Sequence, residues 1–210
     1  MRVLAVGAHF DDVELGCGGV LAKHVAEGDE VIVYVATHSG YSDPNQREIR
    51  SKEVARSEGV KAADILGVDL LCGEWETNEL IFGDPLVCSV LRIVEERKID
   101  TLYTHWTEDA HQDHRALGRA SITAGKHVPR VLMYQSNLYD AGEPFNGNFY
   151  VDISATMERK KEAIAAHESE LGRVGGRWLD VFVGKCTVDG HRIGVPFAEV
   201  FQVVKYLQVS

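Results

Sequence analysis

Short apolar runs that alternate with helical stretches constrain the fold of this chain more than any other feature. The runs span residues 3–7, 30–37, 68–72, 100–104 and 130–135. Between them, apolar residues recur at spacings of three and four over residues 16–27, 47–66, 85–98 and 112–126. This alternation is typical of a parallel sheet with helices on both faces. The sequence therefore predicts an α/β fold with a mostly parallel sheet.

The alternation weakens after residue 135. Residues 137–148 are rich in Gly, Asn and Pro and predict a long loop near the mouth of a site. A helix over 155–171, a glycine-rich break over 172–177 and a final strand over 197–207 follow. With 210 residues and 45% hydrophobic content, the chain can bury one core and is short for two. We expect a single domain over residues 1–210.

The charge balance favours small-molecule partners. The chain carries 22 basic and 32 acidic residues, and its net charge of -10 opposes nonspecific binding to nucleic acid or to an anionic membrane. No apolar run approaches the roughly 20 residues of a membrane span, and the amino terminus lacks a signal-peptide pattern. The four cysteines form no Cys-x-x-Cys pair. These features predict a protein of the reducing cytoplasm.

A cluster of ionisable residues follows the first predicted strand: His9-Phe10-Asp11-Asp12, with Glu14 just beyond. Ligands bind at the carboxyl ends of strands in open α/β sheets. A dinucleotide site is disfavoured, because bulky side chains fill the turn that Gly-x-Gly-x-x-Gly would keep clear. Catalytic zinc takes three protein ligands, of which His9 and Asp12 can supply two, while Asp11 faces water as a base. The alternative is that one aspartate merely caps the next helix.

A second cluster, His111-Gln112-Asp113-His114, follows the predicted strand near residues 100–104. Histidines three residues apart share one face of a helical turn, so His111 and His114 can address one point. Asp113 can pair with a histidine outside the metal shell. A single histidine more often has a structural role, and we keep only His105 and His167 as further candidates, because both lie at the ends of predicted elements.

Together, Ala8-His9-Phe10-Asp11-Asp12-Val13-Glu14 and His111-Gln112-Asp113-His114 resemble the two signature motifs of the PIG-L or LmbE-like N-deacetylases. Those motifs are Ala-His-Pro-Asp-Asp-x-Glu and His-x-Asp-His. The resemblance covers essentially the whole chain. It extends to Gly16-Cys17-Gly18-Gly19, Leu66-Gly67-Val68, Ala166-His167-Glu168-Ser169 and Phe197-Ala198-Glu199-Val200-Phe201. The chain departs from the pattern at Phe10, where the family usually has proline. Neither side chain offers a ligand atom, so we expect metal binding to be unaffected.

The resemblance implies a Rossmann-like three-layer fold and zinc-dependent hydrolysis of the acetamide of an N-acetylated amino sugar. Carried over by motif position, the zinc ligands are His9, Asp12 and His114, with Fe²⁺ as another divalent metal of interest. Asp11 corresponds to the general base and His111 to the residue that stabilises the oxyanion, as an imidazolium favoured by Asp113. Asp113 would orient a histidine, and Glu14 would lie outside the ligand set. Family analogy also predicts a homo-oligomer.

The substrate and two rival functions stay open at this point. Arg47, Arg50 and Arg56 fall on one predicted helix and can meet a sugar-linked diphosphate, or can pair with neighbouring glutamates. The sugar can therefore be free, nucleotide-linked or part of a glycoconjugate. The rival enzyme is a metal-dependent phosphoesterase, which two imidazole ligands disfavour because Mg²⁺ and Mn²⁺ prefer oxygen. A catalytically silent sugar-binding protein is the third class, and the presence of Asp11 argues against it.

Overall fold

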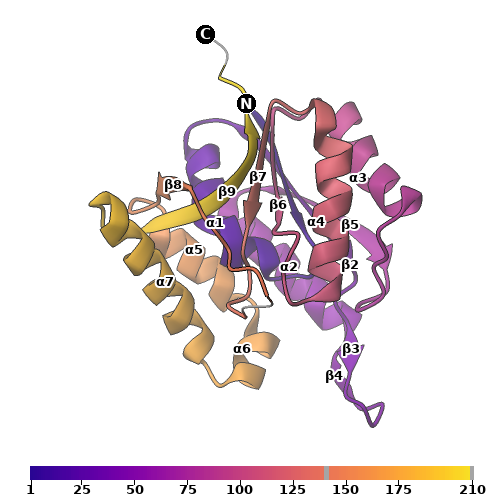
Figure 1. Ribbon diagram of the computed structural model, residues 1–210. Coiled ribbons are helices and arrows are strands. Elements are labelled where there is room, and N and C mark those ends of the chain that lie inside the picture. Colours follow the sequence, from indigo (N-terminus) through magenta and orange to yellow (C-terminus); the bar gives the residue numbers. More distant parts are fainter. Residues whose placement is uncertain (140–141, 209–210) are drawn as a thin grey trace.

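A seven-stranded sheet runs through the computed structural model, which describes residues 1–139 and 142–208 (Figure 1). The strand order is β5-β2-β1-β6-β7-β9-β8. The strands are β1 (Arg2–Gly7), β2 (Glu30–Thr37), β5 (Asp69–Trp75), β6 (Thr101–His105), β7 (Arg130–Tyr134), β8 (Phe149–Asp152) and β9 (Ala198–Tyr206). The first five strands of this order are joined by parallel pairings, whereas β9 runs antiparallel to both β7 and β8. The predicted, mostly parallel sheet is confirmed.

Helices cover both faces of the sheet (Figure 1). One face carries α3 (Asp84–Glu96) and α4 (Gln112–Ala124), followed by the short 3-10 helix η1 (Gly125–His127). The other carries α1 (Asp12–Ala26), α2 (Lys52–Leu66), α5 (Met157–Ala165) and α7 (Arg177–Ile193). Successive strand residues point to opposite faces, so Val3 packs in the α1 layer and Leu4 in the α3–α4 layer. The three-layer, Rossmann-like arrangement is confirmed.

The order of the strands locates the site. From β1 the chain moves outward to β2 and β5, then returns to place β6 on the other side of β1. After β1 the chain enters α1 on one face, and after β6 it enters α4 on the opposite face. Such a point, where the direction of winding reverses, leaves a crevice at the carboxyl ends of the two strands. The two ionisable clusters lie at this crevice.

The helix predicted over residues 47–66 begins later than expected. α2 starts at Lys52, and the Ser51 side chain caps it by accepting a hydrogen bond from the Val54 amide. Before it, β3 (Tyr41–Ser42) and β4 (Glu48–Arg50) form an antiparallel hairpin that projects from the body of the protein (Figure 1). The prediction that Arg47, Arg50 and Arg56 share one helix is therefore wrong.

The helix predicted over residues 155–171 is two helices, α5 and α6 (Glu168–Val174), which separate at residues 166–167. The glycine-rich break ends in Gly175 and Gly176, both with positive φ, and the long helix α7 begins directly after them. This helix was not expected from the sequence. The final strand is confirmed as β9, and the predicted loop over 137–148 has no helix in its described part, with residues 140–141 lying outside the described residues.

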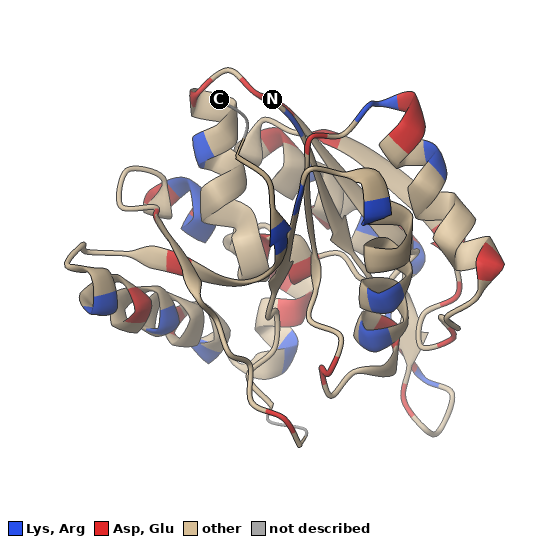
Figure 2. Cartoon of the chain, turned by 45° about the horizontal axis from the view of Figure 1, so that its top comes forward, with Lys and Arg blue, Asp and Glu red and all other residues tan. Residues whose placement is uncertain are grey.

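Figure 2 shows acidic and basic residues interspersed along the outer helices rather than separated by sign. Within residues 1–139 and 142–208, no helix combines the length and the apolar character that crossing a bilayer requires.

Candidate functional site

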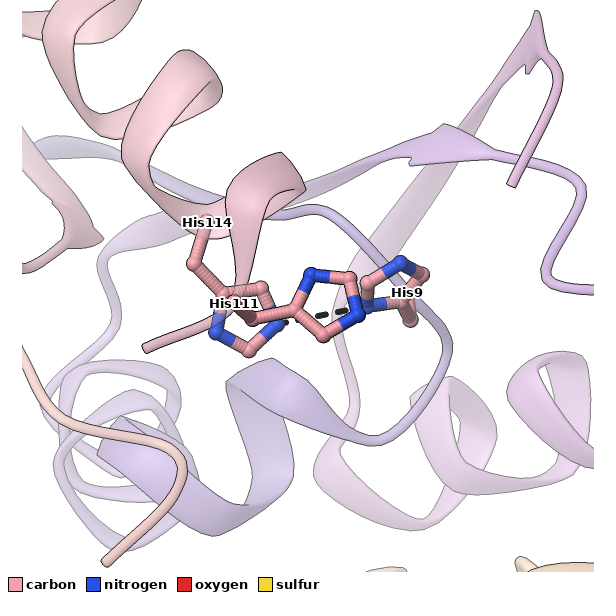
Figure 3. A group of neighbouring side chains, drawn as sticks. All are labelled: His9, His111 and His114. Atoms are coloured by element: carbon pink, nitrogen blue, oxygen red, sulfur yellow. Dashed lines mark hydrogen bonds between the residues drawn. The ribbon is translucent and has the colours of Figure 1, made fainter. Parts of the chain in front are cut away.

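The three side chains predicted as metal ligands converge where β1 and β6 end. His9 precedes α1, Asp12 opens that helix, and His114 lies in the first turn of α4. His9 Nδ1 lies 3.3 Å from Asp12 Oδ2 and 3.3 Å from His114 Nε2, and His114 Nε2 lies 3.1 Å from Asp12 Oδ1. Figure 3 shows the hydrogen bond between the rings of His9 and His114, with the ring of His111 drawn across it in this view. All three residues thus direct donor atoms to one point.

This donor set fits a metal ion of borderline softness. Two imidazole nitrogens and a carboxylate are the ligands typical of catalytic zinc, and they also suit other divalent transition metals. Asp12 and His114 are only 3% and 4% exposed, so the donors are held in place by the surrounding protein. Among the described residues, His9, His111 and His114 can also place one ligand atom each within 4.8 Å of one another, as can Asp12, His105 and His114.

Two carboxylates orient the ligand histidines from outside. Asp113 Oδ2 lies 3.0 Å from His9 Nε2, and Asp109 Oδ1 lies 3.3 Å from His114 Nδ1. Each contact engages the ring nitrogen that points away from the centre, which leaves the other nitrogen free for a metal. Asp113 also accepts hydrogen bonds from the Asn78 and Leu80 amides. Sequence analysis gave Asp109 no role, although its place after β6 and just before the second motif was a signal.

Asp12 is held as a carboxylate. Burial opposes its charge, but His114 and His105 outweigh burial and keep the pKa of Asp12 well below its usual range. Asp12 Oδ2 accepts a hydrogen bond from the His9 amide at 2.8 Å, and Oδ1 accepts one from Ser136 Oγ at 2.9 Å. The carboxylate is therefore fixed in both charge and orientation before any ligand arrives.

Asp11 has a different environment from its neighbour. It occupies the position before α1 with φ of 124°, a strained conformation for a non-glycine residue, and its side chain makes no capping hydrogen bond. Burial and the negative charge of Asp12 raise the pKa of Asp11 to about 7. The capping alternative therefore does not describe Asp11, whose carboxyl group lines the cavity beside the ligand residues.

His111 is a neutral imidazole rather than the imidazolium expected from the sequence. Burial and the neighbouring His9 and His114 lower its pKa to about 4. The Asp113 carboxylate is bonded to His9 instead, while His111 Nδ1 accepts the Asp113 backbone N–H at 3.2 Å. With Nδ1 occupied as an acceptor, a neutral His111 carries its proton on Nε2. His111 is thus a neutral hydrogen-bond donor at the edge of the ligand cluster.

The two further histidine candidates lie behind the site. His105 Nε2 accepts the Ala8 amide at 3.0 Å and lies 3.2 Å from Asp12 Oδ2, with its ring stacked on His114. His167 Nε2 lies 3.5 Å from Glu14 Oε1. Both histidines are fully buried and neither lines the cavity.

A cavity of about 660 Å³ opens over the ligand cluster. Its floor contains His9, Asp11, Asp12, His111 and His114. Its outer wall comes from the hairpin base, the 137–139 loop, and α6 and α7, and includes Tyr41, Arg50, Asn137, Tyr139, Glu170, Arg173, Arg177, Trp178 and Val181. Sequence analysis missed the wall from α7, although Trp178, Phe182 and Cys186 recur at a spacing of four.

Among the three arginines considered from sequence, only Arg50 lines this cavity. Arg50 is 4% exposed and donates to Glu58 Oε2 at 2.7 Å and to the Phe10 carbonyl oxygen at 3.2 Å. Pairing with a neighbouring glutamate, the second of the two alternatives, therefore describes this residue. Arg50 holds the loop that carries the first motif.

Comparison with known proteins shows which family the chain resembles. The family described as PIG-L: GlcNAc-PI de-N-acetylase matches residues 4–125. The uncharacterized deacetylase YaiS of Escherichia coli (strain K12) is 30% identical over 137 residues, covering 64% of this chain and 73% of that protein. The diacetylchitobiose deacetylase of Thermococcus kodakarensis is 26% identical over 216 residues, covering 91% of this chain and 80% of that protein.

Solved structures share the fold. N,N'-diacetylchitobiose deacetylase from Pyrococcus horikoshii superposes with a TM-score of 0.82 at 22% identity, covering 97% of this chain and 83% of that chain. The 4-carboxy-2-hydroxymuconate hydratase GalB from Pseudomonas putida KT2440 superposes with a TM-score of 0.80 at 17% identity, covering 100% and 98%. Since a deacetylase and a hydratase share this fold, the reaction has to be argued from the site.

Proposed function

Because the chain belongs to the PIG-L family, we propose that it is a metal-dependent N-deacetylase that hydrolyses the acetamide of an N-acetylated amino sugar. One observation carries the proposal. His9 Nδ1, His114 Nε2 and the Asp12 carboxylate converge within 3.3 Å of one another on the floor of a cavity that Asp11 and His111 also line. This arrangement supports a reacting centre surrounded by metal ligands, a base and a hydrogen-bond donor.

Hydrolysis of an amide requires a stronger nucleophile and a stronger electrophile than water and acetamide provide at neutral pH. Zinc held by His9, Asp12 and His114 would lower the pKa of water to about 7 and polarise the acetyl carbonyl. Asp113 and Asp109 hold the two histidines with their free nitrogens toward the centre. The protein therefore presents its ligands already oriented.

Asp11 acts as the general base in this proposal. Its pKa of about 7 leaves a large fraction ionised at neutral pH, so it can take a proton from water and later return that proton to the leaving amine. His111 donates a hydrogen bond from its Nε2–H to the oxygen that becomes negative as water attacks the carbonyl. A donor in this position typically accelerates a reaction by about a hundredfold to a thousandfold.

The cavity wall supports a sugar-sized substrate. Its volume of about 660 Å³ falls in the range of about 300–1,000 Å³ that is usual for small-molecule sites. The wall combines aromatic, amide and charged side chains, represented by Trp178, Asn137 and Arg177. Arg50 is already bonded to Glu58 and the Phe10 carbonyl, so a sugar-linked diphosphate would have to meet Arg173 or Arg177 of the cavity wall instead.

Acetate release tests the proposal. Zinc-loaded and Fe²⁺-loaded protein would be incubated with N-acetylglucosamine, diacetylchitobiose, a nucleotide-linked N-acetylglucosamine and a lipid-linked one, alongside phosphate monoesters. We expect acetate from at least one sugar, loss of that activity in Asp11→Asn, and full activity in Asp64→Asn, an exposed aspartate of α2. No acetate from any sugar by metal-loaded protein would contradict the proposal. Phosphate release from the esters would favour the phosphoesterase instead.

A further inference from the structure

Lys160 of α5 and Glu199 of β9 form an ion pair in the core, outside the cavity. They are 1% and 3% exposed, and Lys160 Nζ lies 2.5 Å from Glu199 Oε1. Burial disfavours the charge on Lys160, but the attraction of Glu199 outweighs burial and raises the pKa of the lysine. Buried pairs of this kind often stabilise a fold no better than apolar residues of the same volume. The pair therefore calls for a role other than stability.

Lys160 and Glu199 both contact a single turn of α1. The elements α1, α5 and β9 lie together in Figure 1. Lys160 Nζ donates to the Leu15 carbonyl oxygen at 2.7 Å. Glu199 accepts the Gly19 amide on Oε1 at 2.9 Å and the Val20 amide on Oε2 at 2.7 Å. In a regular α-helix the amide of residue 19 would bond to the carbonyl of residue 15. Lys160 thus contacts the carbonyl of Leu15 and Glu199 contacts the amide of Gly19, which are the acceptor and the donor of one backbone pair of the helix.

Glycines allow this close approach. A Cβ at Gly19 would lie 2.6 Å from Ile153 Cδ1 and 3.1 Å from Glu199 Oε1. A Cβ at Gly16 would lie 2.1 Å from Tyr134 Cδ2. These contacts explain Gly16 and Gly19 of the glycine cluster after the first motif, for which the proposed chemistry has no use. Because glycine makes a helix intrinsically less stable, this turn depends on side chains from other elements for its shape.

The turn leads directly to the first motif. The Leu15 amide donates to the Asp11 carbonyl oxygen at 3.0 Å, so the residue that Lys160 contacts is bonded to the proposed base. We propose that Lys160 and Glu199 are positioning residues: their ion pair fixes the first two turns of α1 and thereby aims Asp11 and Asp12 at His9 and His114. The part of this inference that concerns turnover rests on the proposed function, whereas the part that concerns metal binding does not.

A neutral pair, Lys160→Met with Glu199→Gln, tests this role. Three quantities would be measured: zinc affinity by competition with a chromophoric chelator, kcat and KM separately, and the free energy of unfolding. We expect zinc affinity to fall about 10- to 100-fold, a size usual for the loss of residues that orient metal ligands, and kcat to fall with KM little changed. The control is Lys61→Met with Glu168→Gln, an exposed pair at 2.8 Å that joins α2 and α6, which should change none of the three.

Unchanged zinc affinity and kcat in the neutral pair, at whatever stability, would overturn the inference. If that variant does not fold, Glu199→Asp replaces it, because it keeps both charges and withdraws the carboxylate from the Gly19 and Val20 amides by one methylene. A fall in its zinc affinity supports the positioning role, and wild-type affinity overturns it. If wild-type protein releases no acetate while the variants still lose zinc affinity, the proposed function fails and the positioning of the metal ligands stands.

Discussion

The ring of Phe10 lies against Gly59 of α2, so closely that a Cβ at Gly59 would meet Phe10 Cδ1 at 2.1 Å. Phe10 is 2% exposed, its amide donates to Ser39 Oγ at 2.9 Å, and its carbonyl accepts from Arg50. Each part of the residue between His9 and Asp11 is thus held by another segment. This packing accounts for a phenylalanine where the family usually has proline, since the ring fixes the loop by contact rather than by a restricted backbone.

Gly59→Ala should destabilise the protein although alanine favours helices. The added methyl has to displace a buried ring, which costs about 1–3 kcal/mol and outweighs the gain of about 1 kcal/mol in helix propensity. Gly184→Ala is the matched control, because a Cβ there meets nothing within 4 Å, and it should stabilise by about 0.5–1 kcal/mol. Urea unfolding measures both variants. Equal effects of the two substitutions would contradict the described packing.

His114→Ala and Asp11→Asn should separate metal binding from turnover. The first removes a proposed ligand and should lose zinc and activity together. The second should keep zinc and lose about a hundredfold to ten-thousandfold in kcat, the usual contribution of a general base. Metal content after dialysis and kcat of the reloaded protein provide the measurement. Comparable zinc loss in both variants would assign Asp11 to the ligands instead.

His111→Ala should lower kcat about a hundredfold to a thousandfold and leave zinc content unchanged, because it removes the Nε2 proton donor without removing a proposed ligand. His111→Gln offers an amide N–H of similar reach and should recover part of the loss. Steady-state kinetics on the substrate found by the acetate assay gives both values. A glutamine variant no better than alanine would argue against donation as the role of this residue.

Asp113→Asn should weaken zinc binding about 10- to 100-fold. Asparagine keeps an acceptor for only one of the Asn78 and Leu80 amides, which bond to different oxygens of Asp113, and it loses the negative charge that faces His9 Nε2 at 3.0 Å. Chelator competition measures the affinity, and near-ultraviolet circular dichroism checks that the fold is intact. Asp84→Asn, at the start of α3, serves as the control, and an Asp113 variant with equal affinity to that control would contradict the orienting role.

Glu58 should give the protein a pH-dependent part of its stability. Burial opposes its charge, but hydrogen bonds from Ser169 and Arg50 outweigh burial and lower the pKa of Glu58 below its ordinary 4.5. A lowered folded-state pKa contributes stability that is complete above the ordinary pKa and disappears as pH falls through the folded-state value. Urea unfolding of Glu58→Gln should therefore show a deficit at pH 7 that shrinks in acid. A deficit that stays constant over this range would contradict the ionic contribution, and Glu48→Gln, at an exposed position of β4, should show no deficit.

The sequence predicted the sheet and the convergence of the two motifs because both depend on local patterns. The strands β1 and β6 are short apolar runs, and any parallel sheet brings their carboxyl ends to one edge. The hairpin of β3 and β4 was missed, since its few polar residues continue the helical spacing of α2, although Ser51 marked the true start of that helix. Tertiary contacts rather than local pattern determine this part of the fold.

The sequence also did not predict which distant side chains pair with each other at the site. That Asp113 bonds to His9 rather than to His111 depends on how α4 is placed against the loop before α1. Likewise, nothing local joins Lys160 to Glu199, which are 39 residues apart on different elements. Spacing within a motif predicted which residues gather at the site, and the packing of helices on the sheet determines which atoms of those residues meet.

The floor of the cavity and much of its wall come from different parts of the chain. The proposed ligands, base and oxyanion donor all lie within residues 9–114, whereas α6, α7 and the preceding loop supply wall residues between 136 and 181. Exchanging the segment over residues 136–181 between relatives would therefore change which substrate is preferred without changing the reaction. The chain is organised so that selectivity can diverge independently of chemistry.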